Sequence, residues 1–292
     1  MFIWFLLAAV LSTLLTGPLL FFLRSIKARQ VEREEGPSSH KAKSGTPTMG
    51  GVVFVLIVAV FSLLFLNSYL FPVVLLTLGF ALIGFLDDFF KIQKKQNLGL
   101  TFWQKIILQT LIASLFAITR WNVSLLNFIF WVFIIVGAAN ATNLTDGLDG
   151  LLSGTAILAF LSFTVVAFKA GLYSSATFPL VFAGAITGFL VYNFPKAKLF
   201  MGDVGSLSIG AALAGFAILI GKEWLLALIG FIFVIEALSV IIQVAFFKLF
   251  KRRIFKMSPL HHHFELSGFR EFQVVIGFWV FQLILSILGA II

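Results

Sequence analysis

Cysteine is absent from this 292-residue chain. Its absence excludes disulfide frameworks, thiolate catalysis and zinc sites built on sulfur. Charge is scarce as well, since Asp, Glu, Lys and Arg make up only 11% of the residues. Hydrophobic residues make up 60% of the chain, 37 residues are Phe, and the mean hydropathy is +1.08. This composition excludes a soluble enzyme and indicates a protein that crosses a membrane several times.

The apolar residues form long uninterrupted runs rather than short alternating strands. Because a helix satisfies its backbone hydrogen bonds within one segment, such runs predict membrane-spanning helices rather than a β-barrel. No internal repeat or low-complexity linker divides the chain, which predicts one integral-membrane domain over residues 1–292. We expect an all-α polytopic membrane protein of about ten transmembrane helices, at residues 2–23, 50–66, 69–90, 102–119, 125–141, 151–168, 177–194, 204–221, 224–247 and 271–292.

The loops between these segments differ in charge. All but three of the 21 Lys and Arg residues fall on one side of the predicted membrane, and the exceptions are Arg120, Lys169 and Lys222. The positive-inside rule makes the basic side cytoplasmic and places both termini outside the cytoplasm. The first segment has no basic residues before it and no small-residue cleavage site, so we expect a retained span rather than a signal peptide. The net charge of +9 favours anionic partners such as lipid headgroups, phosphates or nucleotides, although topology signals account for most of the excess.

Five polar clusters lie at the predicted cytoplasmic ends of the spans, at residues 43–48, 87–88, 143–149, 193–203 and 258–265. The sharpest is the third. Asn143, Asp146 and Asp149 recur every third residue, which would place them along one face of a helical turn. Oxygen ligands without Cys or His indicate Mg²⁺, or the hydroxyl groups of a sugar or nucleotide, rather than zinc. A simple turn between two spans would explain Gly147 and Gly150 but not the repeated Asn and Asp.

Two other clusters carry carboxylates. Asp87 and Asp88 end the third predicted span, one turn before Lys91. Adjacent carboxylates suit a divalent cation or a proton-abstracting base, while a solvated helix end with an Asp-Lys pair is the plain alternative. Asp203 opens the eighth span, where it would serve equally well as a helix N-cap or as a metal ligand. Phe200 lies close before it and is available to stack on a base.

The last cluster contains three consecutive histidines, His261, His262 and His263. Ser258 as N-cap and Pro259 at the first helical position predict a helix start, where free N–H groups favour phosphate. The histidines could donate hydrogen bonds to a pyrophosphate or act as acid or base, but consecutive side chains cannot all face one ligand.

The first cytoplasmic loop carries a further candidate phosphate site. Its Lys43 and Thr48 could bind phosphate, or they could belong to an ordinary basic turn.

Taken together and in this order, the motifs of the five clusters resemble the phospho-N-acetylmuramoyl-pentapeptide transferase (MraY) family over nearly the whole chain. The three-His motif and the Thr-Pro-Thr-Met-Gly-Gly run separate this family from relatives that transfer other sugar phosphates to polyprenyl phosphate. The motifs that carry the resemblance are 45–51, 87–91, 143–150, 200–206 and 261–265.

The resemblance implies a multi-pass protein of the bacterial inner membrane, usually a homodimer, with its active site on the cytoplasmic face. It implies Mg²⁺-dependent transfer of phospho-MurNAc-pentapeptide from UDP-MurNAc-pentapeptide to undecaprenyl phosphate, giving lipid I and UMP. This is the first membrane step of peptidoglycan synthesis, on which cell shape and division depend. Membrane lipid is an implied partner, and nucleic acid is not.

Residue roles follow from the resemblance by motif. Asp203 would bind Mg²⁺, and Asp87 and Asp88 would form the carboxylate pair near the acceptor phosphate. Lys105 matches a further family lysine only through an uncertain alignment and receives no role. The remaining expected substrate-binding or catalytic residues, which line the nucleotide and metal region, stack on uracil, contact phosphates or order the site, are Lys43, Thr48, Lys91, Asn143, Asp146, Asp149, Asn193, Phe200, His261 and His262.

The sequence leaves alternative mechanisms and functions open. Asp87 could deprotonate the acceptor phosphate for direct attack on the donor, or a two-step route could pass through an aspartyl phosphate. A sibling transferase would use another UDP-sugar with the same lipid. A secondary transporter would place charges near the membrane midplane, often with repeat symmetry, whereas these charges gather at one face. A purely structural scaffold would not require five loops rich in phosphate-binding residue types.

Overall fold

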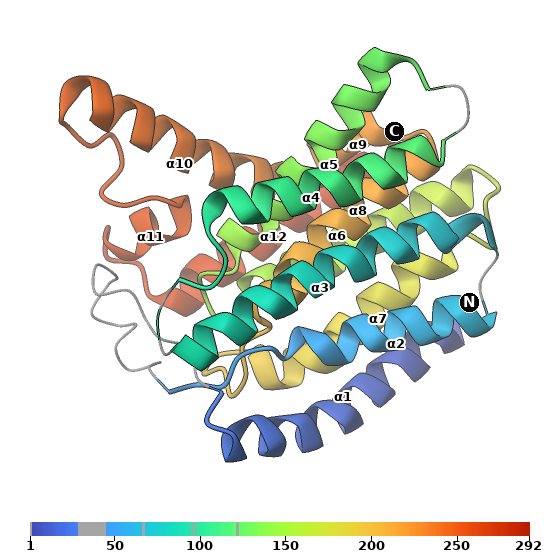
Figure 1. Cartoon of the computed structure of the whole chain (residues 1–292), viewed down its shortest axis with the longest axis horizontal. Helices are drawn as coiled ribbons and strands as arrows, with labels where there is room; N and C mark the ends of the chain where they lie inside the picture. Colours follow the sequence, from blue (N-terminus) through green and yellow to red (C-terminus); the bar gives the residue numbers. More distant parts are fainter. Residues whose placement is uncertain (1, 29–44, 66–67, 95, 97, 121–122) are drawn as a thin grey trace.

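The regular elements of the protein are helices. The computed structural model describes residues 2–28, 45–65, 68–94, 96, 98–120 and 123–292. The all-α fold class is confirmed (Figure 1). The elements are α1 (Phe2–Ser25), α2 (Gly51–Phe65), a 3-10 turn (Ser68–Leu70), α3 (Phe71–Lys94), α4 (Phe102–Ile118), α5 (Leu125–Thr145), α6 (Leu151–Lys169), α7 (Thr177–Asn193), α8 (Gly202–Leu219), α9 (Glu223–Ile229), α10 (Phe231–Phe250), α11 (Leu260–Glu265) and α12 (Glu271–Ile291).

In the described part of the chain, each of the ten predicted apolar segments overlaps a helix. Within the described residues, seven helices are long and apolar enough to cross a membrane, and α2, α4 and α7 are shorter apolar helices. The ninth predicted segment, residues 224–247, differs from the structure because it is divided at Gly230 into α9 and α10. The fifth was predicted to end at residue 141, but α5 continues to Thr145, so Asn143 lies inside a helix. The chain is therefore a multi-pass membrane protein.

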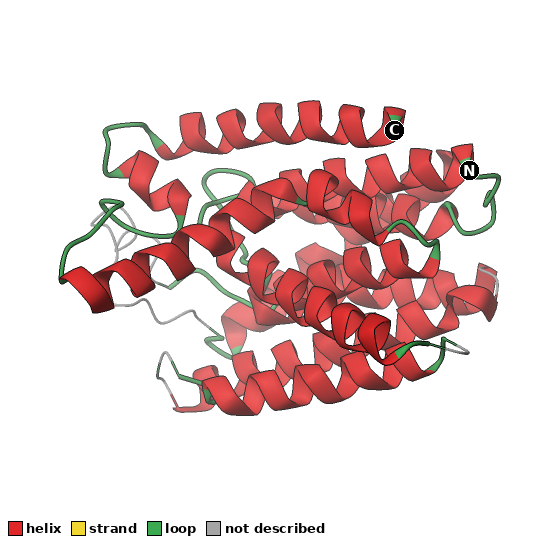
Figure 2. Ribbon diagram, turned by 90° about the horizontal axis from the view of Figure 1, so that it is seen from above, coloured by secondary structure: helices red, strands yellow, loops and turns green. Residues whose placement is uncertain are grey.

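The helices run side by side along the length of the bundle (Figures 1 and 2). The principal neighbours are α3 with α8, α1 with α7, α5 with α8, α6 with α7, and α6 with α12. Helix α8 lies at the centre of the bundle, since 89% of its 18 residues are buried inside the protein. Both ends of the described chain lie at one end of the bundle, and α11 lies at the other, beside the far end of α10 (Figures 1 and 2).

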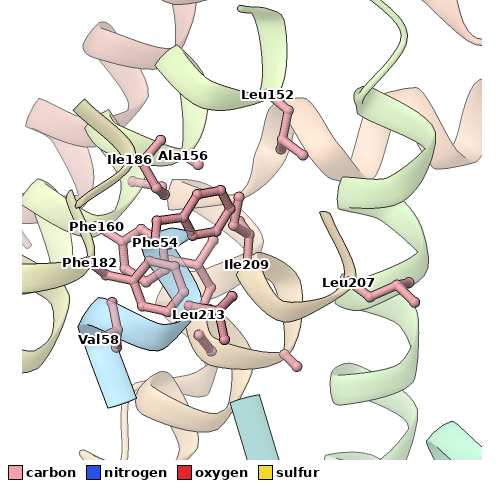
Figure 3. Packing of buried hydrophobic residues seen from close by; sticks show 14 of the residues in the cluster. Phe54, Val58, Leu152, Ala156, Phe160, Phe182, Ile186, Leu207, Ile209 and Leu213 are labelled. Atoms are coloured by element: carbon pink, nitrogen blue, oxygen red, sulfur yellow. The ribbon is translucent and has the colours of Figure 1, made fainter. Parts of the chain in front are cut away.

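Aromatic side chains fill the interior between these helices. Phe160 of α6 and Phe182 of α7 stack with ring centroids 4.4 Å apart, and Phe54 of α2 packs against Phe182 (Figure 3). All three are fully buried. In a membrane, where lipid is as apolar as the core, close packing of this kind holds helices together.

Glycine brings α3 and α8 together. A Cβ atom at Gly84 would overlap the backbone carbonyl group of Asp203. Small residues at such crossings let helix backbones approach closely. Because Asp87 lies one turn after Gly84, this contact brings the carboxylates of α3 next to the first turn of α8.

The close approach at Gly84 predicts that Gly84→Ala lowers stability. The added methyl group has no space, so α3 and α8 must separate at a cost of about 1–3 kcal/mol. Gly277→Ala in α12 is the matched control, because a Cβ there meets nothing within 4 Å. Thermal unfolding of the purified protein in detergent should show a lower midpoint for Gly84→Ala alone. Equal midpoints for the two variants would contradict the tight crossing.

Candidate active site

Three carboxylates from two helices meet at the end of the bundle opposite the termini. Asp87 and Asp88 come from α3, and Asp203 comes from the first turn of α8. Each offers an oxygen atom, and these atoms lie within 4.8 Å of one another. Asp87 and Asp88 are buried. Because Met201 occupies the N-cap position of α8, Asp203 does not act as the helix cap.

Two lysines neutralise much of this charge. Lys91 Nζ lies 2.6 Å from Asp87 Oδ2 and 3.2 Å from Asp203 Oδ2. Lys105, from the first turn of α4, lies 2.9 Å and 2.6 Å from the same two oxygen atoms. Three carboxylates and two ammonium groups in such proximity leave one formal negative charge. Buried charges persist only when they are paired in this way.

Hydrogen bonds fix each carboxylate. The Leu100 N–H donates to Asp87 Oδ1 at 2.7 Å, and the Val204 N–H donates to Asp88 Oδ2 at 3.2 Å. Asn143 Nδ2 donates to Asp203 Oδ1 at 2.9 Å. The cluster is therefore assembled from α3, α4, α5 and α8, and its oxygen atoms have little freedom to move.

The cluster fits a hard divalent cation. Its donors are all carboxylate oxygens, which Mg²⁺ prefers over nitrogen or sulfur. The residual negative charge favours a cation. Gly202 adopts a left-handed conformation with φ 72°, and a Cβ there would overlap Asp88 Oδ2, so the position of this carboxylate requires glycine. The three Asp residues can bind a metal ion.

A cavity of about 1920 Å³ opens over the cluster. Its polar end is lined by the three carboxylates and by both lysines, and it continues along apolar side chains of α5 and α10. Of the other predicted site residues, the cavity lining includes Thr48, Asn143, Asp146, Asn193, Phe200, His261 and His262. Lys43 lies outside the described residues.

Asp149 does not line the cavity. Its Oδ2 accepts a hydrogen bond of 2.8 Å from the Ala197 N–H. Asn193 donates to the Leu199 carbonyl oxygen at 3.1 Å and accepts a bond from Ser153 at 2.6 Å. Both side chains therefore hold the segment between α7 and α8, which carries Phe200 to the cavity.

The three histidines have three different partners. His261 is fully buried, and its Nδ1 lies 3.1 Å from Glu236 Oε2 of α10. His262 borders the cavity, with its Nδ1 2.9 Å from Glu265 Oε2. His263 Nδ1 accepts a bond of 3.1 Å from the Lys256 N–H. The three side chains therefore have separate roles in holding α11 and the segment before it.

Two polar residues of this region were not predicted as site residues. Lys105 received no role from the sequence. A capping box between Thr101 and Gln104 starts α4 just before Lys105, and the Lys105 ammonium group reaches Asp203. Glu236 was not singled out at all, although it is a lone carboxylate in the ninth apolar segment. A charged residue inside such a segment is itself a signal of function.

Comparison with known proteins gives two matches to family descriptions. Glycosyl transferase family 4 matches residues 70–221, and phospho-N-acetylmuramoyl-pentapeptide-transferase signature 1 matches residues 43–55.

Individual relatives match over nearly their whole length. The chain is 46% identical to the phospho-N-acetylmuramoyl-pentapeptide-transferase of Bacillus pumilus (strain SAFR-032) over 303 residues, covering 96% of this chain and 94% of the relative. It is 46% identical to that of Bacillus subtilis (strain 168), covering 97% and 95%. It is 47% identical to that of Geobacillus kaustophilus (strain HTA426), covering 98% and 94%.

The charge balance of the cluster predicts that Lys105→Gln destabilises the protein and that a divalent cation restores part of the loss. Removing one ammonium group leaves buried carboxylates unpaired, at a cost of about 1–3 kcal/mol after allowance for partial exposure. Thermal unfolding with and without MgCl₂ measures both effects. Lys94→Gln, an exposed lysine on the same side of the protein, is the control. An unfolding midpoint for Lys105→Gln that equals the control's would refute the pairing.

Proposed function

Because the chain belongs to the phospho-N-acetylmuramoyl-pentapeptide-transferase family, within glycosyl transferase family 4, we propose that it transfers phospho-MurNAc-pentapeptide from UDP-MurNAc-pentapeptide to undecaprenyl phosphate. The products are lipid I and UMP. The observation that carries the proposal is the cluster of three carboxylates and two lysines in a cavity that continues along apolar helices. A site suited to a pyrophosphate thus adjoins a surface suited to a lipid chain.

The transfer is a direct displacement. Asp87 takes the proton from the acceptor phosphate, and an oxygen of that phosphate attacks the β-phosphorus of the donor. The bond from this phosphorus to the bridging oxygen breaks, and UMP leaves with the electron pair. Phosphoryl transfer depends mainly on positioning and on neutralising anionic oxygens. Lys91 and Lys105 supply that neutralisation, since both ammonium groups already lie among the carboxylates.

Asp203 holds Mg²⁺ in this proposal, with Asp87 and Asp88 adjacent. When bound, the ion supplies Lewis-acid stabilisation of the pyrophosphate oxygens. Asn143 orients Asp203 through its 2.9 Å hydrogen bond, which keeps one carboxylate oxygen in place.

The donor lies against the wall formed by the end of α5 and the segment before α8. Phe200 stacks on the uracil ring, and Asn143, Asp146 and Asn193 contact the nucleotide and sugar. Asp149 acts on this wall by holding Ala197. Phosphate contacts fall to Lys43, Thr48, Lys91 and His262, whereas the buried His261 orders the site.

The protein acts at the bacterial inner membrane, with its active site facing the cytoplasm, where a soluble UDP-sugar meets a lipid acceptor. The excess of basic residues at the ends of the spans near the cluster supports this orientation. We expect both termini outside the cytoplasm and a homodimer in the membrane.

The proposed reaction predicts UMP release from UDP-MurNAc-pentapeptide, and not from UDP-N-acetylglucosamine, when undecaprenyl phosphate is present. Chelation of divalent cations should abolish release. Asp203→Asn should lower the turnover by about 10²–10³-fold, because it removes charge stabilisation of the transition state. Lys94→Gln should retain the wild-type rate. Equal turnover of both UDP-sugars would favour a sibling transferase, and donor uptake into proteoliposomes without UMP would favour a transporter.

A further inference from the structure

Glu236 is a carboxylate inside an apolar membrane-spanning helix, and its side chain is fully buried. It lies outside the cluster of three Asp residues described above. Burying a carboxylate in such a segment is costly unless its oxygens are hydrogen-bonded. The partners of Glu236 therefore show what it is for.

Both oxygens of Glu236 accept from one residue. The backbone N–H of His261 donates to Oε1 at 3.2 Å, and Nδ1 of the same residue lies 3.1 Å from Oε2. An ionised carboxylate can only accept hydrogen bonds, so Nδ1 must carry a proton. The two carboxylate oxygens accept from the two N–H donors of His261. An amide side chain of similar shape has only one acceptor oxygen and could not do so.

The opposite edge of the imidazole packs against Gly147, in the turn that follows α5. A Cβ atom at Gly147 would overlap His261 Nε2, so the ring fills the space that the glycine leaves. Nε2 is buried and has no hydrogen-bond partner among the described residues. With the proton on Nδ1, Nε2 is a bare acceptor; with the proton on Nε2, an N–H group would be buried without a partner, which is rarer in proteins.

We propose that Glu236 is a positioning residue that fixes the proton of His261 on Nδ1 and presses the ring against Gly147. This contact docks α11 onto the turn between α5 and α6. It thereby sets the separation between His262 on α11 and Asp146, which directly follows α5; both residues line the cavity.

Gln243 provides a contrast on the same helix. Its amide accepts from the N–H groups of Ile254 and Phe255 and donates to the Phe255 carbonyl oxygen. It holds the segment before α11 but does not touch His261. Loss of Gln243 should therefore loosen the segment without moving the proton of the histidine.

The test replaces Glu236 by Gln, which keeps the shape but offers one acceptor and two donors. If the amide oxygen accepts from the His261 N–H, the amide nitrogen faces Nδ1 and forces the proton onto Nε2. Ring nitrogen shifts of ¹⁵N-histidine-labelled protein report the tautomer. The chain has only four His, and His261 is assigned by the signal lost in His261→Gln.

We expect wild-type His261 to be protonated on Nδ1 and bare on Nε2, and Glu236→Gln to show the reverse. In the same variant, kcat for UMP release should fall about 10–100-fold, as for other losses of a histidine-orienting carboxylate, with a smaller change in KM for the donor. Gln243→Ala should keep the wild-type tautomer. Ser239→Ala removes a buried hydroxyl that bonds only within α10 and should change neither measurement.

Three results would overturn the proposal: a wild-type His261 with its proton on Nε2 alone, an unchanged tautomer in Glu236→Gln, or a wild-type kcat in that variant. The wild-type spectrum decides the first even if Glu236→Gln fails to fold. Only the turnover measurement rests on the proposed function. Failure of the wild-type protein to release UMP would count against that function and leave the tautomer assignment intact.

Discussion

The site depends on neutralising three carboxylates that two helices bring together beside a membrane. Asp87 and Asp88 could not remain buried near Asp203 without Lys91 and Lys105, because unpaired buried charges of one sign repel and lose their hydration. The need to place two lysines beside the three carboxylates determines how the neighbouring helices pack. Helix α3 must cross α8 at Gly84, and α4 must begin where Lys105 can reach α8.

The polar residues of the site divide into two groups by their contacts. One group faces the cavity, as Asn143 and the three carboxylates do. The other holds backbone segments in place: Asp149 binds the Ala197 N–H, and Glu236 binds His261. The second group fixes the turns and loops that complete a site whose charged cluster lies on helices. Asp149 ties the turn before α6 to the segment between α7 and α8, and Glu236 ties α11 to α10.

Much of the fold could be predicted from the sequence because the membrane requires long apolar helices, and the ten segments follow directly from hydropathy. The grouping of polar clusters at one end of the bundle followed from alternation of the spans. The break at Gly230 was not predicted, since α9 and α10 form one continuous apolar run in sequence. A single glycine in such a run does not distinguish a tolerated residue from a helix end.

The site was predicted through its motifs, and the residues between motifs were missed. Lys105 lies near the start of a helix without other charges, and only the tertiary fold shows that α4 lies beside α3. Likewise, sequence spacing gave Asn143, Asp146 and Asp149 one shared face. In the structure, α5 ends at Thr145, so the last two lie beyond the helix and Asp149 turns toward Ala197.

Asp87, Asp88 and Asp203 can together form one cation site, and two lysines balance the rest of their charge. Binding of Mn²⁺, a paramagnetic substitute for Mg²⁺, measured by electron paramagnetic resonance on the purified protein, tests it most directly. We expect one tightly bound ion per chain, with the affinity lowered at least about tenfold in Asp203→Asn because a charged ligand is lost. Wild-type affinity in Asp203→Asn would contradict it.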